Sequence, residues 1–494
     1  MKLQLGSTFA PRGKGQGFNG LAAVLLIALI AVGDVTAAER PPNVVLILAD
    51  DLGYGDLGCY GQTIIKTPNL DRMASGGIRF SQFYAGSTVC APSRCVLMTG
   101  LHTGHCRIRG NGGPPGVGTL RHEDVTLAEL MREAGYATAC CGKWGLGEAN
   151  PALAREGLPN DQGFDYFYGY LNHTHAHNYY PEFLWRNMER VPLQNIVEKL
   201  NPGSPGGYAT KKVEYSPDLV TDEAFQFVRE HGDEPFFLYW AVTIPHANNE
   251  ARRATSDGQE VPDYGPYADE PWPNPDKGQA AMITRMDADV GRLFKLFDEL
   301  DIADKTLVLF TSDNGPHHEG GQDLDRFDPN GPLRGIKRDL YEGGIRVPLI
   351  AWWPKKIAAG VVSDHVSYHG DVFATLAEAI DQTATSATDS ISLMPTLRGD
   401  ADSQKQHDYL YWEFYEQGGK QAVRWQDWKA VRMPMHTGRT ELYNLASDIG
   451  ETDDVASDHP DIVARLEALM DQGHAPDAMW KPRGKPANNN KRYP

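Results

Sequence analysis

The segment PNVVLILADDLG, residues 42–53, indicates the architecture of this chain. Its apolar run is uninterrupted, which is typical of a strand buried on both faces of a parallel sheet. Two carboxylates, Asp50 and Asp51, and a glycine end the run. The segment TLVLFTSDNG, residues 306–315, has the same form and ends in Asp-Asn-Gly. Both segments therefore predict a buried strand with acidic groups directly after its carboxyl end.

Further apolar runs, PFFLYWAVTIPH (residues 235–246) and VPLIAWWP (residues 347–354), predict two more strands of this parallel kind. Helical periodicity marks residues 282–301, where apolar residues recur every three or four positions, and residues 126–136, where Thr126 is the expected N-cap. Strands alternating with helices predict an α/β fold with a large, mostly parallel but mixed central sheet flanked by helices. In such sheets ligands bind at the carboxyl ends of the strands.

The organisation changes along the chain. Residues 243–277 are polar and rich in proline and aromatic residues, and we expect a long functional loop there. After about residue 400, short segments with strand character predict a smaller C-terminal α+β subdomain with an antiparallel sheet, closed by a helix at residues 460–472. We therefore expect a catalytic domain at 39–400, this subdomain at 401–480 and a disordered tail at 481–494.

The N-terminus has the features of an export signal. Lys2, Arg12 and Lys14 precede twelve apolar residues at 21–32, and the small residues VTAA follow, with cleavage expected after Ala38. A signal peptide at 1–38 implies a periplasmic or secreted protein, and an uncleaved anchor is the alternative. No later stretch is long and apolar enough to span a bilayer, so we expect no membrane partner after cleavage.

Composition narrows the choice of partners. The 494 residues include 47 Lys plus Arg and 65 Asp plus Glu, a formal net charge of −18. This charge disfavours nucleic acid and anionic membranes but leaves open an anionic small substrate at a locally basic site. Of the six cysteines, the adjacent Cys140 and Cys141 are poorly placed to pair with each other. The cysteine spacings match no zinc pattern.

Two pairs of oxygen donors suggest a metal site. Asp50, Asp51, Asp313 and Asn314 offer only oxygen ligands, which favours a hard cation, calcium or magnesium. Either pair alone could equally be a turn or a helix cap. Two such pairs at two strand ends are harder to explain in that way.

Five motifs then point to one family: CAPSRCVLMTG (90–100), GKWGLG (142–147), IPH (244–246), SDNG (312–315) and GIKRDLYEGGIRVP (335–348). Together they resemble the type I, formylglycine-dependent sulfatases of the alkaline-phosphatase superfamily, over nearly the whole chain from about Pro42. The resemblance implies an alkaline-phosphatase-like fold and the conversion of Cys90 to formylglycine (3-oxoalanine), hydrated as a gem-diol. That conversion requires a formylglycine-generating maturation enzyme as a partner. One Ca²⁺ ion is the implied cofactor.

The resemblance also implies roles for individual residues. The implied metal ligands are Asp50, Asp51, Asp313, Asn314 and the modified Cys90. Arg94 matches the arginine that fixes the gem-diol, and Lys143 and Lys337 match lysines that hold the sulfate oxygens. His246 matches the histidine that contacts the sulfate and protonates the leaving oxygen. A gem-diol oxygen on calcium attacks sulfur better than a serine hydroxyl does, and its second hydroxyl allows sulfate to leave.

One position departs from this pattern. Many members of the family have a histidine where this chain has Gly145, and that histidine acts as the base during sulfate release. The histidines at alternate positions in NHTHAHNYYP (residues 172–181) are candidates to replace it, and alternation on an extended segment would put all three on one side. They can equally be a surface or metal-scavenging cluster. His102, His105 and Lys143 are further candidates.

The expected activity is arylsulfatase-type hydrolysis of sulfate monoesters, with a sulfated carbohydrate or an aryl sulfate as the substrate. The region around residues 175–187 resembles bacterial sulfatases that act on carbohydrates, which favours sulfated galactose or N-acetylgalactosamine. Candidate residues for stacking on a sugar are Tyr179, Tyr180, Trp185, Tyr264 and Trp272. Two rival interpretations are a phosphate or phosphonate monoester hydrolase of the same superfamily and a sulfated-glycan-binding protein without catalysis.

Overall fold

The computed structural model describes residues 40–112, 118–148, 156–383 and 387–485. The predicted export signal at 1–38 lies outside the described residues, as do residues 486–494 of the predicted tail. The compact unit that begins at Pro41 contains both the large sheet and the C-terminal sheet. The division of domains at residue 400 therefore stays a prediction. Within the described residues, no helix combines the length and the apolar character needed to cross a bilayer.

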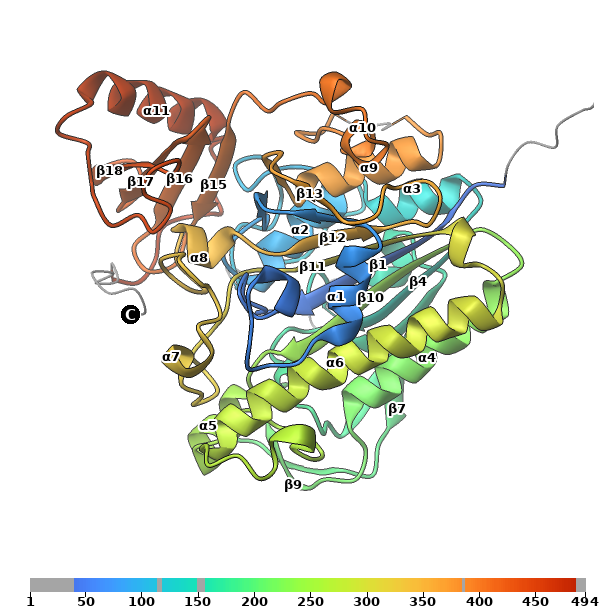
Figure 1. Cartoon of the computed structure of the whole chain (residues 1–494). Helices are drawn as coiled ribbons and strands as arrows, with labels where there is room; N and C mark the ends of the chain where they lie inside the picture. Colours follow the sequence, from blue (N-terminus) through green and yellow to red (C-terminus); the bar gives the residue numbers. More distant parts are fainter. Residues whose placement is uncertain (1–39, 113–117, 149–155, 384–386, 486–494) are drawn as a thin grey trace, which may run out of the picture. The chain divides into compact units, whose positions relative to one another are not determined.

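A ten-stranded mixed sheet forms the centre of this unit (Figure 1). Its five central strands, β11, β1, β10, β4 and β5, are mutually parallel. The large, mostly parallel but mixed sheet expected from the sequence is therefore confirmed. In order across the sheet the strands are β13 (Val361–Ser363), β2 (Ile78–Phe80), β12 (Leu349–Trp352), β11 (Thr306–Ser312), β1 (Asn43–Asp50), β10 (Phe236–Pro245), β4 (Ala137–Lys143), β5 (Tyr166–Tyr170), β6 (Phe183–Arg186) and β7 (Glu189–Pro192).

Strand β12 corrects one expectation, because it runs antiparallel to β11 rather than parallel. A parallel return needs a crossover to the opposite edge of the sheet. Here residues 313–348 stay at the carboxyl end of β11 and form only the short helices α7 (Leu324–Phe327) and α8 (Glu342–Ile345). The chain thus re-enters the sheet from the edge that it left, and this connection brings Lys337 to the end of β11.

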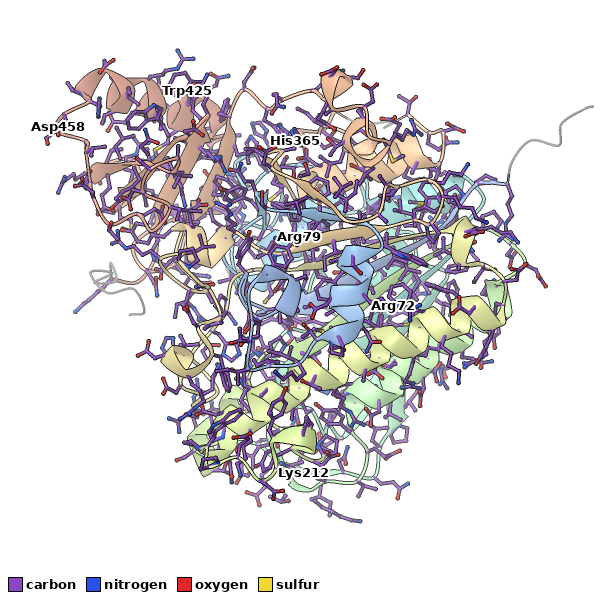
Figure 2. All side chains as sticks on the ribbon, in the orientation of Figure 1. Arg72, Arg79, Lys212, His365, Trp425 and Asp458 are labelled. Carbon is purple, nitrogen blue, oxygen red and sulfur yellow. The ribbon has the colours of Figure 1, made fainter. Side chains whose placement is uncertain are left out.

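Helices cover both faces of the sheet. The core on one face includes buried residues of α2 (Cys90–Thr99), α3 (Leu127–Glu133) and α9 (Gly370–Ala379). The opposite core includes those of α1 (Pro68–Ser75), α4 (Ser216–His231) and α6 (Asn274–Glu299). Side chains fill the space between these layers (Figure 2). The predicted apolar face of α6 is buried, and Thr126 caps α3 in a capping box with Glu129.

The predicted loop at residues 243–277 is only partly a loop. Strand β10 extends to Pro245, α5 spans Asn249–Thr255, and α6 begins at Asn274. The Asn248 side chain accepts hydrogen bonds from the first backbone N–H groups of α5, which explains where that helix starts. Proline and aromatic content alone did not reveal this local cap.

Several short elements complete the catalytic part. They are β3 (Phe83–Tyr84), β8 (Ile196–Glu198), β9 (Tyr208–Lys211), β14 (Ser367–Tyr368), α10 (Met394–Leu397) and the 3₁₀ turns η1 (Gly58–Tyr60), η2 (Pro159–Gln162), η3 (His175–His177), η4 (Gly265–Tyr267), η5 (Ala303–Lys305) and η6 (Ala401–Ser403). All six cysteines are free thiols. Cys140 and Cys141 lie on β4 and face opposite cores, as strand alternation requires.

The C-terminal part contains the predicted antiparallel sheet, which is confirmed. Its strands, β15 (Leu410–Phe414), β16 (Lys420–Trp425), β17 (Trp428–Met433) and β18 (Arg439–Asn444), pair in sequence order. Helix α11 (Pro460–Gly473) packs its buried Leu466 and Met470 against Val423 and Leu442.

Buried charges join this sheet to the catalytic part. Lys429 on β17 pairs with Glu342 of α8 at 2.9 Å and with Glu451 at 3.0 Å. All three side chains are fully buried. Burial and the neighbouring Glu342 raise the pKa of Glu451 to about 7, although Lys429 opposes the shift. Arg346 also pairs with Glu342, at 3.1 Å, so two cations balance the two carboxylates at this junction.

We expect Lys429→Met to lower the free energy of unfolding by about 3–5 kcal/mol, because it leaves the buried Glu451 without its cation and leaves Glu342 with Arg346 alone. Chemical denaturation measures this loss. Lys295→Met is the matched control: Lys295 is exposed and, among the described residues, pairs with Glu299 alone at 3.8 Å, so its loss should stay within about 0.5 kcal/mol. Equal effects of the two substitutions would contradict the structural importance of the buried lysine.

Candidate active site

Four adjacent parallel strands end at one edge of the sheet, and each supplies a polar side chain there. Asp50 is the last residue of β1 and Lys143 is the last residue of β4. His246 directly follows β10, and Asp313 directly follows β11. Because the strands lie side by side in the order β11-β1-β10-β4, these four side chains converge. All four are buried.

The backbone at Asp51 lets two consecutive carboxylates face this edge. Asp51 has φ of 66°, in the left-handed region that non-glycine residues seldom adopt. Its N–H donates to Asp313 Oδ1 at 3.1 Å, and the next N–H, of Leu52, donates to Ser312 Oγ at 2.9 Å. These bonds hold the turn after β1 against the end of β11. Both predicted acidic pairs therefore lie in one place.

Cys90 is the first residue of α2 and is only 2% exposed. Its Sγ and one carboxylate oxygen each from Asp50 and Asp313 lie within 4.8 Å of one another. The Asn111 side chain holds the start of the helix, because Nδ2 lies 3.1 Å from Cys90 Sγ and Oδ1 accepts the Ala91 N–H at 2.9 Å. Helix α2 thus starts at the first residue of the CAPSRCVLMTG motif. Asn111 was not recognised in the sequence, because no motif carries it.

Arg94 ties α2 to two strands. Its Nε and Nη2 donate to Asp313 Oδ2 at 3.0 and 2.8 Å, and Nη1 donates to the Lys143 carbonyl at 2.6 Å. The side chain is fully buried. Burial alone would lower the pKa of Arg94, but Asp313 outweighs it, so the guanidinium stays charged.

Two lysines and His246 complete the cluster. Lys143 Nζ donates to Asp50 at 2.7 Å, and Lys337 Nζ donates to Asp51 at 2.8 Å. Lys337 Nζ also lies 2.9 Å from His246 Nε2, while His246 Nδ1 bonds the Ala247 carbonyl at 2.7 Å. That arrangement leaves Nε2 as an acceptor for the lysine. The structure thus brings together all nine side chains predicted for the site.

The ionisation of these groups follows from burial and pairing. Burial lowers the pKa of His246, and Lys337 lowers it further, so the imidazole is neutral. Burial opposes ionisation of Asp51, but the Lys337 ammonium outweighs it and holds the pKa of Asp51 well below the usual range. Burial and the neighbouring Asp50 raise the pKa of Asp313 to about 7, although Arg94 opposes the shift.

A hard divalent cation fits this donor set. Asn314 Oδ1 is buried and has no hydrogen-bond partner among the described residues, although its Nδ2 donates to Asp51 at 2.7 Å. Three buried carboxylates lie beside it, and all of these donors are oxygen atoms. Three cations, Arg94, Lys143 and Lys337, already balance the carboxylates. A divalent cation would therefore give the site a net positive charge, which suits an anionic ligand.

Comparison with known proteins identifies the family. The sulfatase family model matches residues 42–382, and the model of the C-terminal part of N-sulphoglucosamine sulphohydrolase matches residues 336–475. The chain belongs to the sulfatase family. It is 33% identical to human arylsulfatase A, over 90% of this chain and 89% of that protein. As a member of this family, this sulfatase is a sulfuric ester hydrolase.

Two further comparisons support the assignment. The sulfatase is 30% identical to an N-acetylgalactosamine-6-O-sulfatase of Bacteroides thetaiotaomicron, over 88% of this chain and 93% of that one. Its fold is similar to that of Ps i-CgsB, solved in complex with k-i-k-neocarrahexaose, with a TM-score of 0.71 and 26% identity. That match covers 90% of this chain and 95% of the other. The predicted alkaline-phosphatase-like sulfatase fold is confirmed.

Gly145 has no side chain, and the space that a side chain would fill lies next to the segment that follows β5. Gly145 has φ of 76°, and the atom nearest to a β-carbon built there is Arg94 Cδ at 3.8 Å. Its N–H donates to the Leu171 carbonyl at 3.1 Å, which brings the residues after β5 alongside. Burial lowers the pKa of His173 to about 3, with smaller contributions in the same direction from His177, Lys143 and Lys337. His173 is therefore a neutral imidazole on the segment that lies beside Gly145.

The other histidines of this segment diverge, so the expectation that all three share one side is wrong. Residues His175–His177 form a 3₁₀ turn instead of an extended segment. His177 stacks on His246 with ring centroids 4.9 Å apart, and its Nδ1 lies 3.1 Å from Glu250. His175 instead packs against Tyr170 and Phe183. Turn geometry rather than alternation decides which rings face the site.

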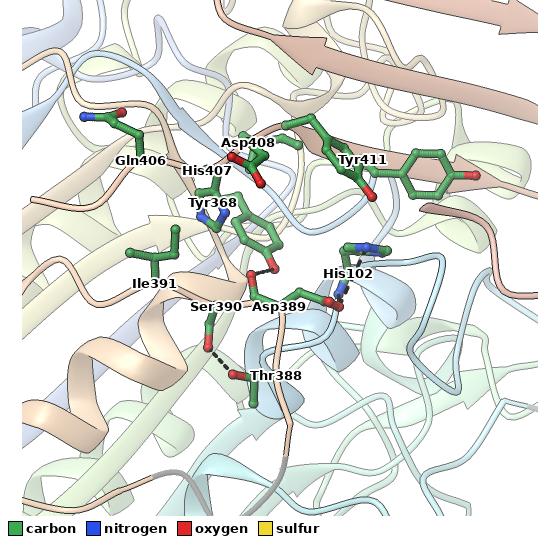
Figure 3. A pocket seen from close by; sticks show the side chains of 12 residues that line it. His102, Tyr368, Thr388, Asp389, Ser390, Ile391, Gln406, His407, Asp408 and Tyr411 are labelled. Carbon is green, nitrogen blue, oxygen red and sulfur yellow. Dashed lines mark hydrogen bonds and ion pairs between the residues drawn. The ribbon is translucent and has the colours of Figure 1, made fainter. Parts of the chain in front are cut away.

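His102 and His105 lie too far from Cys90 to act there. They follow the carboxyl end of α2, whereas Cys90 begins it, and ten helical residues span about 15 Å. His105 Nδ1 lies 2.9 Å from Asp389. Asp389 lines a separate pocket of about 350 Å³ (Figure 3). That pocket is lined by His102, Tyr368, Asp389, His407 and Tyr411 among others.

The predicted sugar-stacking aromatics are only partly available. Tyr179 is fully buried, and its hydroxyl donates to the Thr243 carbonyl at 2.7 Å and to the His246 carbonyl. Tyr179 therefore fixes the backbone at His246. Tyr180 is also buried. Trp185, Tyr264 and Trp272 retain partial exposure.

Besides Asn111, three further residues at the site were not recognised in the sequence. Glu319 pairs with Lys337 at 3.4 Å and with Arg338. His317 stacks on His246 with centroids 5.7 Å apart, and Glu250 pairs with His177. Glu319 and His317 shortly follow the SDNG motif, which is the one signal that could have indicated them.

We expect one divalent cation to bind at Asp50, Asp51, Asp313 and Asn314. Calcium at 100 times its Kd should stabilise the fold by about 2.7 kcal/mol, and a chelator should reverse the effect. Asp313→Asn removes one charge at constant size and should weaken calcium binding about tenfold or more. Asp389→Asn is the control, because Asp389 belongs to the other pocket. Unchanged affinity in Asp313→Asn, measured by titration calorimetry, would contradict this site.

We expect His173→Phe to lower kcat by about 10²-fold or more, with a smaller change in KM, if its imidazole supplies the proton transfer that Gly145 cannot. His175→Phe is the matched control, because it makes the same substitution in a ring that packs against Phe183. Steady-state kinetics on an aryl sulfate measures both variants, and thermal unfolding checks their folding. Equal kcat in the two variants would exclude His173 as the base.

Proposed function

We propose that this sulfatase removes sulfate from carbohydrates at the strand-end site, with residue 90 as the nucleophile after Cys90 is converted to formylglycine. The overall reaction consumes one water and releases an alcohol and hydrogen sulfate from the ester. The observation that carries the proposal is the position of Cys90, where Sγ lies within 4.8 Å of the ligand atoms of Asp50 and Asp313. A nucleophile placed there shares its surroundings with the carboxylates of the cation site.

Two groups that the unmodified chain lacks, a calcium ion and formylglycine, would supply part of the chemistry. Calcium held by Asp50, Asp51, Asp313 and Asn314 would offset negative charge and lower the pKa of a bound hydroxyl, and formylglycine would provide that hydroxyl. The protein positions both through Arg94 and Asn111. Arg94 is fully engaged by Asp313 and the Lys143 carbonyl, so we propose that it orients the start of α2 rather than contacting the ester.

Three side chains are placed for the ester itself. Lys143 and Lys337 carry ammonium groups at the site, and ammonium donors bind the oxygens of an anionic ester. His246 Nε2 faces Lys337 Nζ at 2.9 Å. The proton that the leaving oxygen requires therefore lies on this lysine–histidine pair. Tyr179 holds the backbone at His246, and the ring of His177 stacks on the imidazole.

The proposed substrate is a sulfated galactose or N-acetylgalactosamine unit. The relative named N-acetylgalactosamine-6-O-sulfatase and the carbohydrate complex of Ps i-CgsB support a sulfated sugar. Carboxylates beside the site, Glu319 and Glu250, are acceptors suited to sugar hydroxyls. An aryl sulfate, which the arylsulfatase A relative favours, serves as the reporter substrate.

We expect the purified, matured protein to cleave 4-nitrophenyl sulfate at least about tenfold faster than 4-nitrophenyl phosphate. The peptide containing residue 90 should be about 18 Da lighter than its cysteine form, the mass lost when a thiol becomes an aldehyde. Cys90→Ala, produced in the same host, is the control and should lose both the mass change and the activity. Active protein with an unmodified Cys90, or a preference for phosphate, would overturn the proposed function.

A further inference from the structure

The C-terminal segment reaches Asn111, the residue that contacts Cys90, which the predicted disordered tail at 481–494 did not anticipate. Arg483 N–H donates to the Tyr415 carbonyl at 2.8 Å, and Gly418 N–H donates to the Arg483 carbonyl at 2.8 Å. Trp480 is buried against Tyr415 and donates from Nε1 to the Arg107 carbonyl at 2.9 Å. These contacts dock the segment on the loop that leads to Asn111.

The Arg483 guanidinium is one residue away from the nucleophile. Its Nη2 donates to the Asn111 carbonyl at 3.0 Å, and the Asn111 side chain in turn contacts Cys90 Sγ. Gly110 and Gly112 lie beside the guanidinium, where a β-carbon would approach Nη2 at 3.7 and 3.8 Å. Glycine at these two positions leaves that side of the guanidinium clear. The Arg483 side chain is 39% exposed, so solvent reaches it beside Asn111.

A second arginine, Arg338, lies near Cys90 and shares a carboxylate with Arg483. Arg338 N–H donates to the Thr88 carbonyl at 2.9 Å, two residues before Cys90. Glu416 lies between the two arginines, 3.1 Å from Arg483 Nη2 and 4.0 Å from Arg338 Nε. Glu319 pairs with both Arg338 and Lys337. Outside the cation site, two carboxylates, Glu319 and Glu416, therefore pair with three cations: Lys337, Arg338 and Arg483.

We propose that Arg483 is a specificity-determining residue that binds a second acidic group, a sulfate or a carboxylate, on the sugar being desulfated or on its neighbour. A guanidinium presents a planar fork of donors that matches both kinds of anion. Among the described residues, hydrogen bonds reach only Nη2 of this side chain, which leaves Nε and Nη1 available. The proposal rests on the proposed function and adds a subsite to it.

The test compares substrates that differ only in a second acidic group. The probes are 4-nitrophenyl sulfate, a monosulfated N-acetylgalactosamine, the same sugar linked to a hexuronate, and its disulfated form. We expect wild-type protein to prefer the two doubly acidic sugars, mainly through a lower KM. Arg483→Ala should lose about tenfold or more of that preference, the effect of one charge-assisted hydrogen-bonded pair. The hexuronate and disulfate probes show separately which acid the arginine favours.

Two controls separate recognition from structure. Lys481→Ala removes an exposed cation from the same segment and should leave every rate unchanged. Arg483→Lys keeps the charge without the fork and should restore part of the preference. Calorimetric titration of the disulfated sugar into Cys90→Ala protein, with and without Arg483→Ala, measures binding without turnover. Raising the salt concentration should weaken the wild-type preference.

The outcomes are distinct. If Arg483→Ala slows all substrates equally, or leaves the preference intact, or if wild-type protein shows no preference, the subsite proposal is wrong while the sulfatase activity stands. If wild-type protein with modified residue 90 cleaves no sulfate ester at all, the proposed function fails instead. Binding of the disulfated sugar that is weakened by Arg483→Ala but not by Lys481→Ala would still support the subsite.

Discussion

The buried ion pair between Arg94 and Asp313 connects the elements on which the site depends. Helix α2 brings Cys90, the proposed nucleophilic position, and the end of β11 brings Asp313 of the proposed cation site. The guanidinium donates twice to that carboxylate and once to the carbonyl of Lys143, so it joins α2, β11 and β4. A buried charge that loses its partner destabilises a protein strongly, and the pair therefore resists displacement.

Charge balance explains how an acidic protein holds an anionic substrate. The whole chain has a formal charge of −18, yet its active-site carboxylates are matched by Arg94, Lys143 and Lys337. A divalent cation added to this balanced cluster leaves a positive excess where the ester binds. Because the groups are buried, their fields are screened less than those of surface charges. The local field, and not the net charge, thus decides which ligand is attracted.

The residues of the proposed reaction centre and the residues proposed to contact the substrate around it come from different regions of the fold. Side chains at the ends of β1, β4, β10 and β11 form the reaction centre. Surrounding groups such as His177, Glu319, Glu416 and Arg483 come from turns, loops and the C-terminal segment. The buried Glu342–Lys429–Glu451 cluster fixes the C-terminal sheet against the catalytic part. This fixed junction allows Arg483 to lie at a defined place beside Asn111.

The sequence alone predicted the α/β fold, because apolar runs and helical periodicity are local, and its motifs singled out the nine residues that the structure brings together at the strand ends. It could not determine the direction of β12, which depends on where residues 313–348 return to the sheet. Nor could it show that His177 stacks on His246 while His175 packs against Phe183, because a 3₁₀ turn rather than an extended segment sets their directions. Asn111, Glu319 and Arg483 lie far from Cys90 or Lys337 in the sequence or outside any motif. Only the packing of distant segments places them together, since hydrogen bonds and ion pairs depend on distance in space and not on position along the chain.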